Sequence, residues 1–447
     1  MEWAHGVGSG SDLPIPASTA ILGATAALTI SFAVLVLAWS KPRYQDDASA
    51  PAAQRHRDRP APAVLARLVD SRAFAVALRV VGLAVLAFAV VCVVAGEDDT
   101  STNPVFGLVY VVLWVGLVPA SLLLGPAVRA VSPARTLRDL LVRLLPAERR
   151  DGVVRLPDAV GYWPAAVGLV AFTWLELVSP NGTVLATVAT WFVGYFVVMV
   201  GGGLLFGERW FERADPFEVY STLVAHLSPW SRDGTGRLVV VSPLRHLPRV
   251  VVRPGLVAVV GVLLGSTAFD SFRDSATWVR FRQDHPDSIT LWETLLLVAA
   301  CALVTAVFAA ATAAPTPARG VARRDVPGLL AHSVVPIVVG YMTAHYLTLF
   351  VETGQLTLIQ ASDPLGTGAN LFGTADRNVD IWLSTHPTLL ASIKVLAIVL
   401  GHLVGVVAAH DRALRLLPKG RHDTGQLPLL LVMVAFTFGG LYLIFGL

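Results

Sequence analysis

The chain has 447 residues, of which 55% are hydrophobic and 15% are charged, and its formal net charge is +3. Soluble domains carry about a quarter of their residues as charged side chains, so this composition excludes an ordinary soluble protein and favours a helical membrane protein. The two cysteines, Cys92 and Cys301, stand apart in apolar runs, which excludes a disulfide framework. The sequence contains no phosphate-binding glycine loop, zinc-ligand spacing or serine-elbow motif. The arginines lie beside apolar runs, so nucleic-acid binding has no support.

The apolar runs predict ten transmembrane helices. The first run, 18–40, is followed at once by Lys41 and Arg43 and preceded by a tail without Lys or Arg, which is the reverse of a signal peptide. It therefore predicts a helix whose N-terminus lies outside the cytoplasm. The other runs lie at 73–95, 104–128, 161–179, 184–205, 255–271, 291–313, 329–351, 389–410 and 426–446.

The basic residues indicate the topology. Of the 34 Lys and Arg, 28 fall in alternate loops, and four fall in the opposite loops. The basic loops are 41–72, 129–160, 206–254, 314–328 and 411–425. Because basic loops stay in the cytoplasm, this asymmetry predicts ten crossings with both termini outside.

The longer loops have predicted structure of their own. Loop 133–150 alternates Leu or Val with Arg at helical spacing, which predicts an amphipathic helix with its arginines near the lipid headgroups or, nearly as well, a solvated helix. A similar surface helix is predicted at 215–227. Two β-branched runs around a proline-containing turn predict a cytoplasmic hairpin at 237–253, whereas 41–63 is typical of a flexible linker. Outside, the Gly, Asn and Asp of 352–388 predict a turn-rich cap.

Ionisable side chains of the predicted helices gather at one depth. Such groups are costly in hydrocarbon and usually face a bundle interior or a cavity. At the outer level lie Glu176, Asp270, Glu293, His345 and Lys394, with His5 and Asp12 of the N-terminal tail in the same compartment. This set predicts an outward-facing polar site whose carboxylates and imidazoles serve as metal ligands or as acid and base groups.

Each of these residues also has a simpler interpretation. Glu176, Asp270 and Glu293 lie near helix ends, where carboxylates reach interfacial water. Lys394 can extend toward the interface, and His345 can form an interhelical hydrogen bond. At the inner ends, His332, His410 and Asp411 are typical of packing or interfacial groups.

Six stretches resemble those of a bacterial multi-pass membrane family, some of whose members are named fenitrothion hydrolase. The stretches are AHGVGSGSDLPIP at 4–16, WPAAVGLVAFTWLELVSP at 163–180, FDSF at 269–272, AHYL at 344–347, SDPLGTGANLFGTAD at 362–376 and GHLVGVVAAHD at 401–411. The resemblance implies a bundle in the bacterial plasma membrane and an activity on organophosphate esters. Glu176, Asp270, His345 and His402 fall inside these stretches.

The resemblance also bears on His5. Other members have an Ala-x-Ala cleavage site just before the His-Gly pair, and cleavage there leaves a terminal amine and an imidazole that can chelate copper. This chain departs from the pattern because only MEWA precedes His5. This departure implies either that the start codon is misassigned or that the chain keeps an uncleaved N-terminal tail.

Three functions are consistent with these patterns. The first is a membrane-bound hydrolase of lipophilic phosphotriester-like esters, in which His345 and His5 hold a divalent metal (zinc, copper, manganese or iron) and Lys394, Glu176 and Asp270 are catalytic.

The second function is a transporter of protons or metal ions. In it His345, Lys394, His402, His332 and His410 form a polar ladder across the membrane. The absence of internal repeats and of obviously broken helices counts against this function. The third is a non-catalytic membrane subunit. The expected partners are the lipid bilayer and a lipophilic small molecule or an ion.

Overall fold

The computed structural model describes residues 12–44, 58–146, 149–418 and 422–446. Within these residues the chain forms two compact units. Unit 1 comprises residues 62–222 and 346–385, and unit 2 comprises residues 12–61, 223–345 and 386–446. Helices make up most of both units, which confirms the predicted all-α fold.

Nine helices of the described residues are long and apolar enough to cross a membrane, and a bent pair makes up to ten. The nine are Ala17–Ala38, Arg72–Ala95, Asp158–Leu177, Leu185–Phe206, Leu256–Arg273, Pro286–Ala313, Arg323–Ser362, Pro387–Leu416 and Leu427–Phe445. The bent pair is Pro104–Leu113 with Leu117–Leu124. Each falls on one predicted crossing, so the chain is an integral, multi-pass membrane protein.

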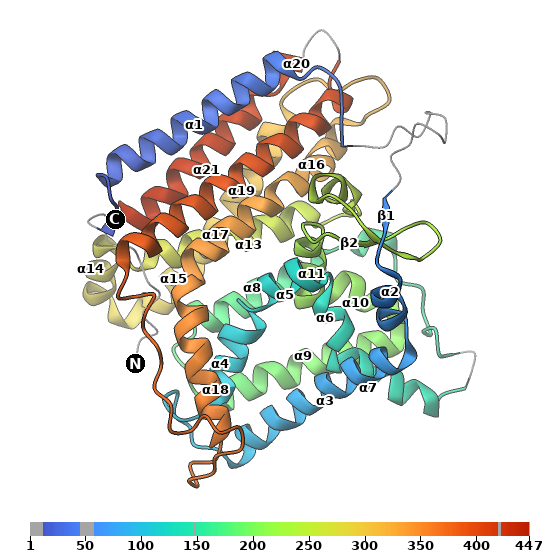
Figure 1. Ribbon diagram of the computed structural model, residues 1–447, viewed down its shortest axis with the longest axis vertical. Coiled ribbons are helices and arrows are strands. Elements are labelled where there is room, and N and C mark those ends of the chain that lie inside the picture. The colour runs from blue at the N-terminus through green and yellow to red at the C-terminus, as the bar shows by residue number, and fades with distance from the viewer. Residues whose placement is uncertain (1–11, 45–57, 147–148, 419–421, 447) are drawn as a thin grey trace. The chain divides into compact units, whose positions relative to one another are not determined.

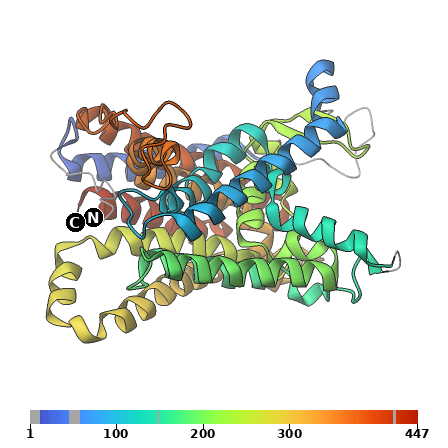
Figure 2. The ribbon, with the colours of Figure 1, turned by 90° about the horizontal axis from the view of Figure 1, so that it is seen from below.

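Unit 2 is a bundle of long helices with a small sheet. Its helices are α1 (Ala17–Ala38), α12 (Pro243–His246), α13 (Leu256–Arg273), α14 (Ala276–Asp284), α15 (Ile289–Ala313), α16 (Val326–Leu330), α17 (Val335–Thr348), α19 (Pro387–Leu416), α20 (His422–Gly425) and α21 (Leu427–Phe445). Short 3-10 turns lie at Leu247–Arg249, Pro286–Ser288, Arg323–Asp325 and Ala331–Val334. In Figure 1, α1 runs beside α21, and α21 runs beside α19. Figure 2 shows α14, in yellow, between the ends of α13 and α15.

The core of unit 2 is α13. In this span 78% of the residues are buried, against 22% in α1. Glycines bring it close to α15, because a Cβ on Gly261 would lie 2.0 Å from Thr305 Oγ1 and one on Gly265 would lie 2.6 Å from Cα of Cys301. The helix follows Gly255, whose φ of +85° suits glycine.

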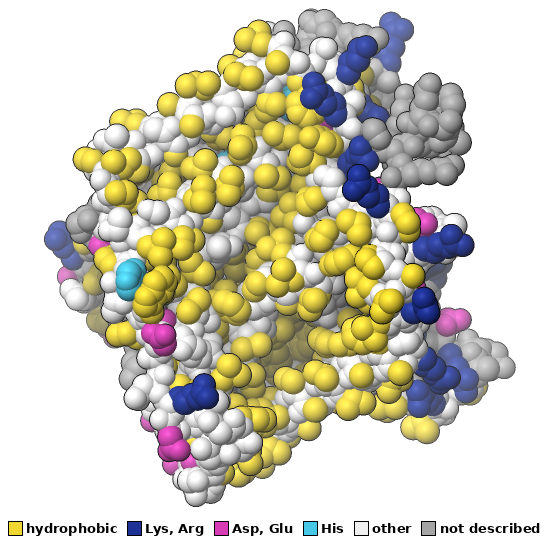
Figure 3. Space-filling model, in the orientation of Figure 1, with side chains coloured by type: hydrophobic (Ala, Val, Ile, Leu, Met, Phe, Trp, Pro, Cys, Tyr) yellow, Lys and Arg dark blue, Asp and Glu magenta, His cyan; other side chains and the backbone are white. Residues whose placement is uncertain are grey.

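The surface of unit 2 matches a bundle in lipid. Hydrophobic side chains cover the visible sides of α1, α19 and α21, and Lys and Arg side chains gather at the α20 end (Figure 3). Basic groups are held on the cytoplasmic side of a membrane. The α20 end therefore agrees with the predicted inner end, and the opposite ends of these helices are called the outer ends, as the predicted topology has them.

The predicted hairpin at 237–253 is wrong, because only the start of this segment is a strand and it pairs within a small three-stranded sheet. Strands β1 (Arg59–Pro60), β3 (Leu238–Val240) and β2 (Trp230–Arg232) pair antiparallel in that order. The turn lies before β3, because Asp233 Oδ1 accepts hydrogen bonds from the backbone N–H groups of Thr235 and Arg237. After β3, Pro243 begins α12, since proline suits the first turn of a helix.

Strand β1 corrects part of the predicted linker at 41–63. Arg59 pairs with Val240 and Pro60 with Val239, so the end of this segment is ordered in the sheet. Residues 45–57 of the predicted linker lie outside the described residues.

Unit 1 contains the bent span and most of the predicted cytoplasmic helices. Its helices are α2 (Ala63–Val69), α3 (Arg72–Ala95), α4 (Pro104–Gly107), α5 (Leu117–Leu124), α6 (Ala127–Val131), α7 (Pro133–Leu141), α8 (Trp163–Leu177), α9 (Leu185–Phe206), α10 (Glu208–Ala214), α11 (Pro216–Ala225, which ends in unit 2) and α18 (Gly354–Ser362). Two π-helical turns lie at Leu108–Leu113 and Leu349–Thr353, and 3-10 turns lie at Val142–Leu144 and Asp158–Val160.

The bent span contradicts the expectation of unbroken helices. It turns by 47° between Leu113 and Leu117, directly after the first π-helical turn. Gly116 stands at the break, and the ring of Phe350, from the second π-helical turn, lies 3.2 Å from where a Cβ on Gly116 would be. π-Helical turns and broken membrane helices are frequent at functional sites.

The part of the predicted surface helix at 215–227 that lies in unit 1 is buried. Phe217, Val219 and Tyr220 of α11 are at most 3% exposed. The Asp215 carboxylate before it accepts a hydrogen bond from Tyr195, in the middle of α9, at 2.9 Å. The segment therefore enters the unit, because its aromatic side chains pack on α8 and α9.

The helix predicted in 133–150 forms as α7, but two of its arginines face inward. Arg135 makes two hydrogen bonds to the buried Glu218 carboxylate, at 2.6 and 2.7 Å, and Arg138 donates to the carbonyl of Gly203. Leu140 and Leu141 are exposed instead. The predicted placement of these arginines at the headgroups is wrong, because buried acceptors bind them.

The predicted cap at 352–388 begins as helix. The second π-helical turn and α18 continue the chain to Ser362. Residues 363–386 contain turns without helix or strand, and the Asp363 carboxylate accepts hydrogen bonds from the N–H groups of Thr367 and Gly368.

Candidate functional site

Four polar side chains of α13 and α17 meet at the outer ends of these helices, and they are called the outer cluster. His345 Nε2 lies 2.9 Å from Asp270 Oδ2, and His345 Nδ1 lies 3.1 Å from Ser271 Oγ. Ser271 Oγ lies 2.9 Å from Tyr341 Oη. All four side chains are at most 3% exposed. They form one hydrogen-bonded series from Tyr341 to Asp270.

The helical period brings these residues together. Tyr341 and His345 are four residues apart and therefore lie on one face of α17. Their rings are nearly parallel, with centroids 6.4 Å apart. Gly440 of α21 leaves room for the Tyr341 ring, since a Cβ there would lie 3.0 Å from it. Asp270 and Ser271 end the buried face of α13.

The geometry of His345 suits proton exchange better than metal binding. One ring nitrogen contacts a carboxylate and the other contacts a hydroxyl, so a metal would have to displace one of these partners. Among the described residues, no three His, Cys, Asp or Glu side chains form a group that could hold a metal ion. His5, the other predicted ligand, lies outside the described residues.

Glu293 has a structural partner near the outer cluster. Its carboxylate accepts hydrogen bonds from Arg282 at 2.8 Å and from Trp278 Nε1 at 3.3 Å, both on α14. The residue is 5% exposed, so the expectation that it reaches interfacial water is wrong. The buried ion pair holds α14 against the start of α15.

Asp274 connects the outer end of α13 to solvent. It follows Asp270 by one helical turn and is exposed. The surrounding protein and, next, the negative charge of Asp270 raise the pKa of Asp274 to about 6. A carboxyl with this pKa exchanges protons near neutral pH.

Lys394 lies on α19 at nearly the same depth as the outer cluster. A Cβ on Gly340 of α17 would lie 2.4 Å from the carbonyl oxygen of Ala397, which sets the register of the two helices. Counting from this contact at 1.5 Å per residue places Lys394 within about 3 Å of the depth of His345. Lys394 is 1% exposed, and Asp12 lies within electrostatic range of it.

Two further histidines lie deeper in unit 2. His402 Nδ1 is 2.9 Å from the carbonyl of Ile398, and His332 Nδ1 is 3.1 Å from the carbonyl of Leu329. A carbonyl can only accept, so each Nδ1 carries the proton and each Nε2 offers a lone pair. Both Nε2 atoms are buried and have no hydrogen-bond partner among the described residues. Such atoms are usually satisfied by water.

His410 has a structural role. Its Nε2 is 2.9 Å from the carbonyl of Trp39, and its Nδ1 is 2.9 Å from Gln426 Oε1. Asp411 beside it accepts hydrogen bonds from the backbone N–H groups of Arg43 and Tyr44. These residues join α19 to the end of α1 and the start of α21. Both are 1% exposed, so their predicted interfacial placement is wrong.

Glu176 belongs to unit 1, whereas Asp270, His345 and Lys394 belong to unit 2. It lies near the end of α8 and is partly buried. Its negative charge acts on Tyr110 of the first π-helical turn and on Tyr220 of α11.

Sequence reasoning missed Ser271, Tyr341 and the buried charges around Arg135. Ser271 is adjacent to Asp270, and Tyr341 stands one turn before His345, so both could have been proposed from spacing alone. The partners of Arg135 lie in α11, far along the chain, and had no local signal.

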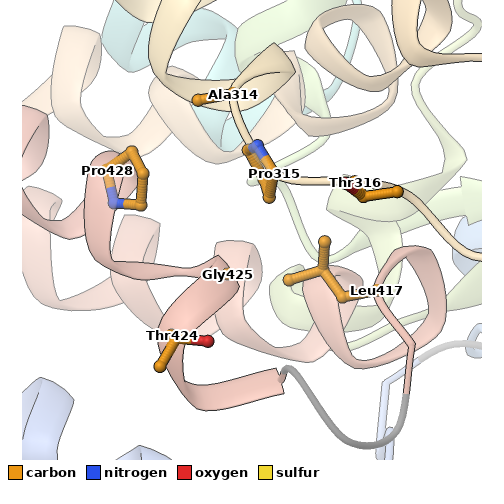
Figure 4. Close-up of a pocket in the computed structure, with 7 residues that line it drawn as sticks. All are labelled: Ala314, Pro315, Thr316, Leu417, Thr424, Gly425 and Pro428. Atoms are coloured by element: carbon orange, nitrogen blue, oxygen red, sulfur yellow. The ribbon is translucent and has the colours of Figure 1, made fainter.

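A pocket of about 280 Å³ opens at the inner end of unit 2 (Figure 4). Its lining residues are Ala314, Pro315, Thr316, Leu417, Thr424, Gly425 and Pro428. None of these described side chains titrates, so the pocket offers no acid, base or ligand group.

The comparisons with known proteins found no match: no family model, curated protein or solved structure is similar to this chain.

Proposed function

We propose that this chain is a proton-translocating protein of the bacterial plasma membrane and that the outer cluster takes up and releases its protons. The proposal is carried by the hydrogen-bonded series Tyr341, Ser271, His345 and Asp270. This series lies on the two spans that are most buried among the described residues. Ionisable groups at such positions mark ion and proton pathways.

Each member of the series can both give and accept a proton. With Asp270 ionised, His345 Nε2–H donates to it, Ser271 donates to Nδ1 and Tyr341 donates to Ser271. When His345 instead carries its proton on Nδ1, a proton that reaches Asp270 from the solvent side, past Asp274, passes to Nε2. Nδ1 then gives its proton to Ser271, Ser271 gives its own to Tyr341, and Tyr341 gives its own to water on the inner side, which leaves Asp270 ionised and Nε2 protonated. The imidazole transfers charge by gaining a proton on one nitrogen and losing one from the other.

His402 and His332 extend the series toward the cytoplasm. A Cβ on Gly401 would lie 2.5 Å from the carbonyl oxygen of Pro336, so Gly401 lies at that level. His402 lies one residue deeper than Gly401, so the depth from Tyr341 to His402 is about 9 Å, and from His402 to His332 about 4.5 Å, at 1.5 Å per residue. One or two waters bridge such gaps, and the lone pairs of both Nε2 atoms are available to them.

The test is proton flux into liposomes that contain the purified protein and a pH-sensitive dye, under an imposed membrane potential. We expect faster acidification than in empty liposomes. Asp270→Asn and His345→Gln should slow it about tenfold or more, which corresponds to about 1.4 kcal/mol in the barrier. His285→Gln is the matched control, because His285 is an exposed outer histidine of the same unit. Wild-type flux equal to that of empty liposomes contradicts the proposal, as does full flux in Asp270→Asn.

A second candidate, ester hydrolysis, has one specific observation in its favour. Ser271, His345 and Asp270 form a nucleophile–base–acid series like that of serine hydrolases, and the family resemblance implies organophosphate substrates. In this reaction Ser271 Oγ attacks phosphorus, His345 takes its proton and the alcohol or phenol of the ester leaves. Water then releases the phosphoryl group from Ser271. Release of nitrophenolate from a lipophilic nitrophenyl phosphotriester, lost in Ser271→Ala, would favour this candidate. The burial of Ser271 argues against it.

A further inference from the structure

Unit 1 contains two buried donors beside the break in its bent span. Trp114 Nε1 and Tyr220 Oη are buried, and neither has a hydrogen-bond partner among the described residues. The centroids of the two rings are 5.4 Å apart. An unpaired buried donor costs about 1–3 kcal/mol, so both groups need an acceptor in this region.

Glu176 is placed to supply this acceptor. The Trp114 ring centroid is 5.1 Å from that of Phe172, which lies one turn before Glu176 on α8. Burial and, next, the negative charge of Glu176 raise the pKa of Tyr220. The loop after α8 folds back here, because Tyr110 Oη donates to the carbonyl of Gly182 at 2.6 Å.

We propose that Glu176 is a second proton-binding site, whose carboxylate is stabilised by the N–H of Trp114 and the O–H of Tyr220, directly or through a bridging water. Trp114 stands at the break in the span, directly after the π-helical turn Leu108–Leu113. This inference does not depend on the function of the outer cluster, because all three residues belong to unit 1.

Two charged groups near α8 have partners of their own. Arg213 of α10 binds Asp158 at 2.9 Å, and Asp215 before α11 binds Tyr195. Tyr110 and Tyr220 are two titratable groups on which the charge of Glu176 acts. Neither tyrosine ionises near neutral pH, since burial raises the pKa of Tyr220 further.

The experiment is a pH titration of the full-length protein by infrared difference spectroscopy of the protonated carboxyl band. We expect a carboxyl band that loses intensity as the pH rises, with a midpoint between pH 4 and 10. The band should be absent in Glu176→Gln and shifted in frequency in Glu176→Asp. Trp114→Phe and Tyr220→Phe should each raise its midpoint by about one to two pH units, because a hydrogen bond to a charged group contributes about 1.5–3 kcal/mol.

Two matched variants are the controls. Trp191→Phe removes another indole of the same aromatic cluster, 5.5 Å from Phe172 between centroids, and Tyr110→Phe removes a hydroxyl already bound to Gly182. Both should leave the midpoint within about half a pH unit of wild type, less than the shift expected for loss of a charged hydrogen bond. The proposal is overturned if the wild type and Glu176→Gln show the same carboxyl bands throughout the titration. It is also overturned if Trp114→Phe and Tyr220→Phe titrate like the controls.

Discussion

Asp215 shows how a buried carboxyl shapes the chemistry of unit 1. Its Oδ1 accepts hydrogen bonds from the N–H groups of Phe217 and Glu218 at the start of α11, and its Oδ2 accepts one from Tyr195. Burial and, next, the negative charge of Glu218 raise the pKa of Asp215 to about 7. The folded protein therefore binds this proton more tightly than the unfolded chain.

This difference makes stability depend on pH. Because the pKa of Asp215 is raised on folding, its contribution to stability is present at acidic pH and is lost as the pH rises toward 7. We expect the free energy of unfolding of the wild type to fall by about 3 kcal/mol between pH 5 and 8, with a matching fall in melting temperature. The stability of the Asp215→Asn variant should fall less over the same pH range, because its side chain does not ionise. Asp233→Asn changes an exposed turn, so its stability should fall with pH as in the wild type. An equal dependence of stability on pH in all three proteins would contradict this account.

At the scale of elements, α17 and α19 depend on small residues for their contact. A Cβ on Gly340, Gly401 or Gly405 would lie 2.4–2.7 Å from a backbone oxygen of the facing helix. Close backbone approach through small residues is the usual way that membrane helices associate. The same contact sets the spacing between Tyr341 and His402 and thus the path proposed for protons.

Gly401→Ala should therefore separate the two helices. We expect a loss of about 1–3 kcal/mol in stability, as for overpacking of a close contact, and slower proton flux. Gly439→Ala on α21 is the control, because nothing lies within 4 Å of a Cβ there. Thermal unfolding in detergent should place the control at or above wild type, since alanine favours helix over glycine. A Gly401→Ala protein as stable as the control would show that the helices are not in close contact.

The helices were predictable from sequence, but their irregularities were not. Long apolar runs predicted the long apolar helices of the described residues, because hydrocarbon thickness determines their length. Gly116 and Pro119 lie beside the bend in the run at 104–128, but the span Leu185–Phe206 also contains glycines without such a break, so these residues alone do not predict a bend. The burial of α11 depends on partners in α7 and α9 that are distant in sequence. Asp270 and His345 could be predicted because charge is rare in membrane helices, whereas hydroxyl groups such as Ser271 attract no notice there.

At the scale of the whole molecule, the distribution of basic residues predicts which loops face the cytoplasm. In unit 1, Ser101 lies in an acidic loop before the bent span, and in unit 2, Thr235 lies in the turn between β2 and β3. Both residues are exposed. With both termini outside, the first loop faces outward and the second faces the cytoplasm.

Cysteine labelling in intact bacteria tests this topology. Cys92 and Cys301 are buried, so the wild type should react little with a membrane-impermeant maleimide. Ser101→Cys should react in intact cells, and Thr235→Cys should react only after the membrane is permeabilised. The opposite pattern would place the 28 basic residues of the alternate loops outside, against the retention of basic loops in the cytoplasm. Because Asp274 and Asp270 would then face the cytoplasm, that result would also reverse the direction in which the outer cluster exchanges protons.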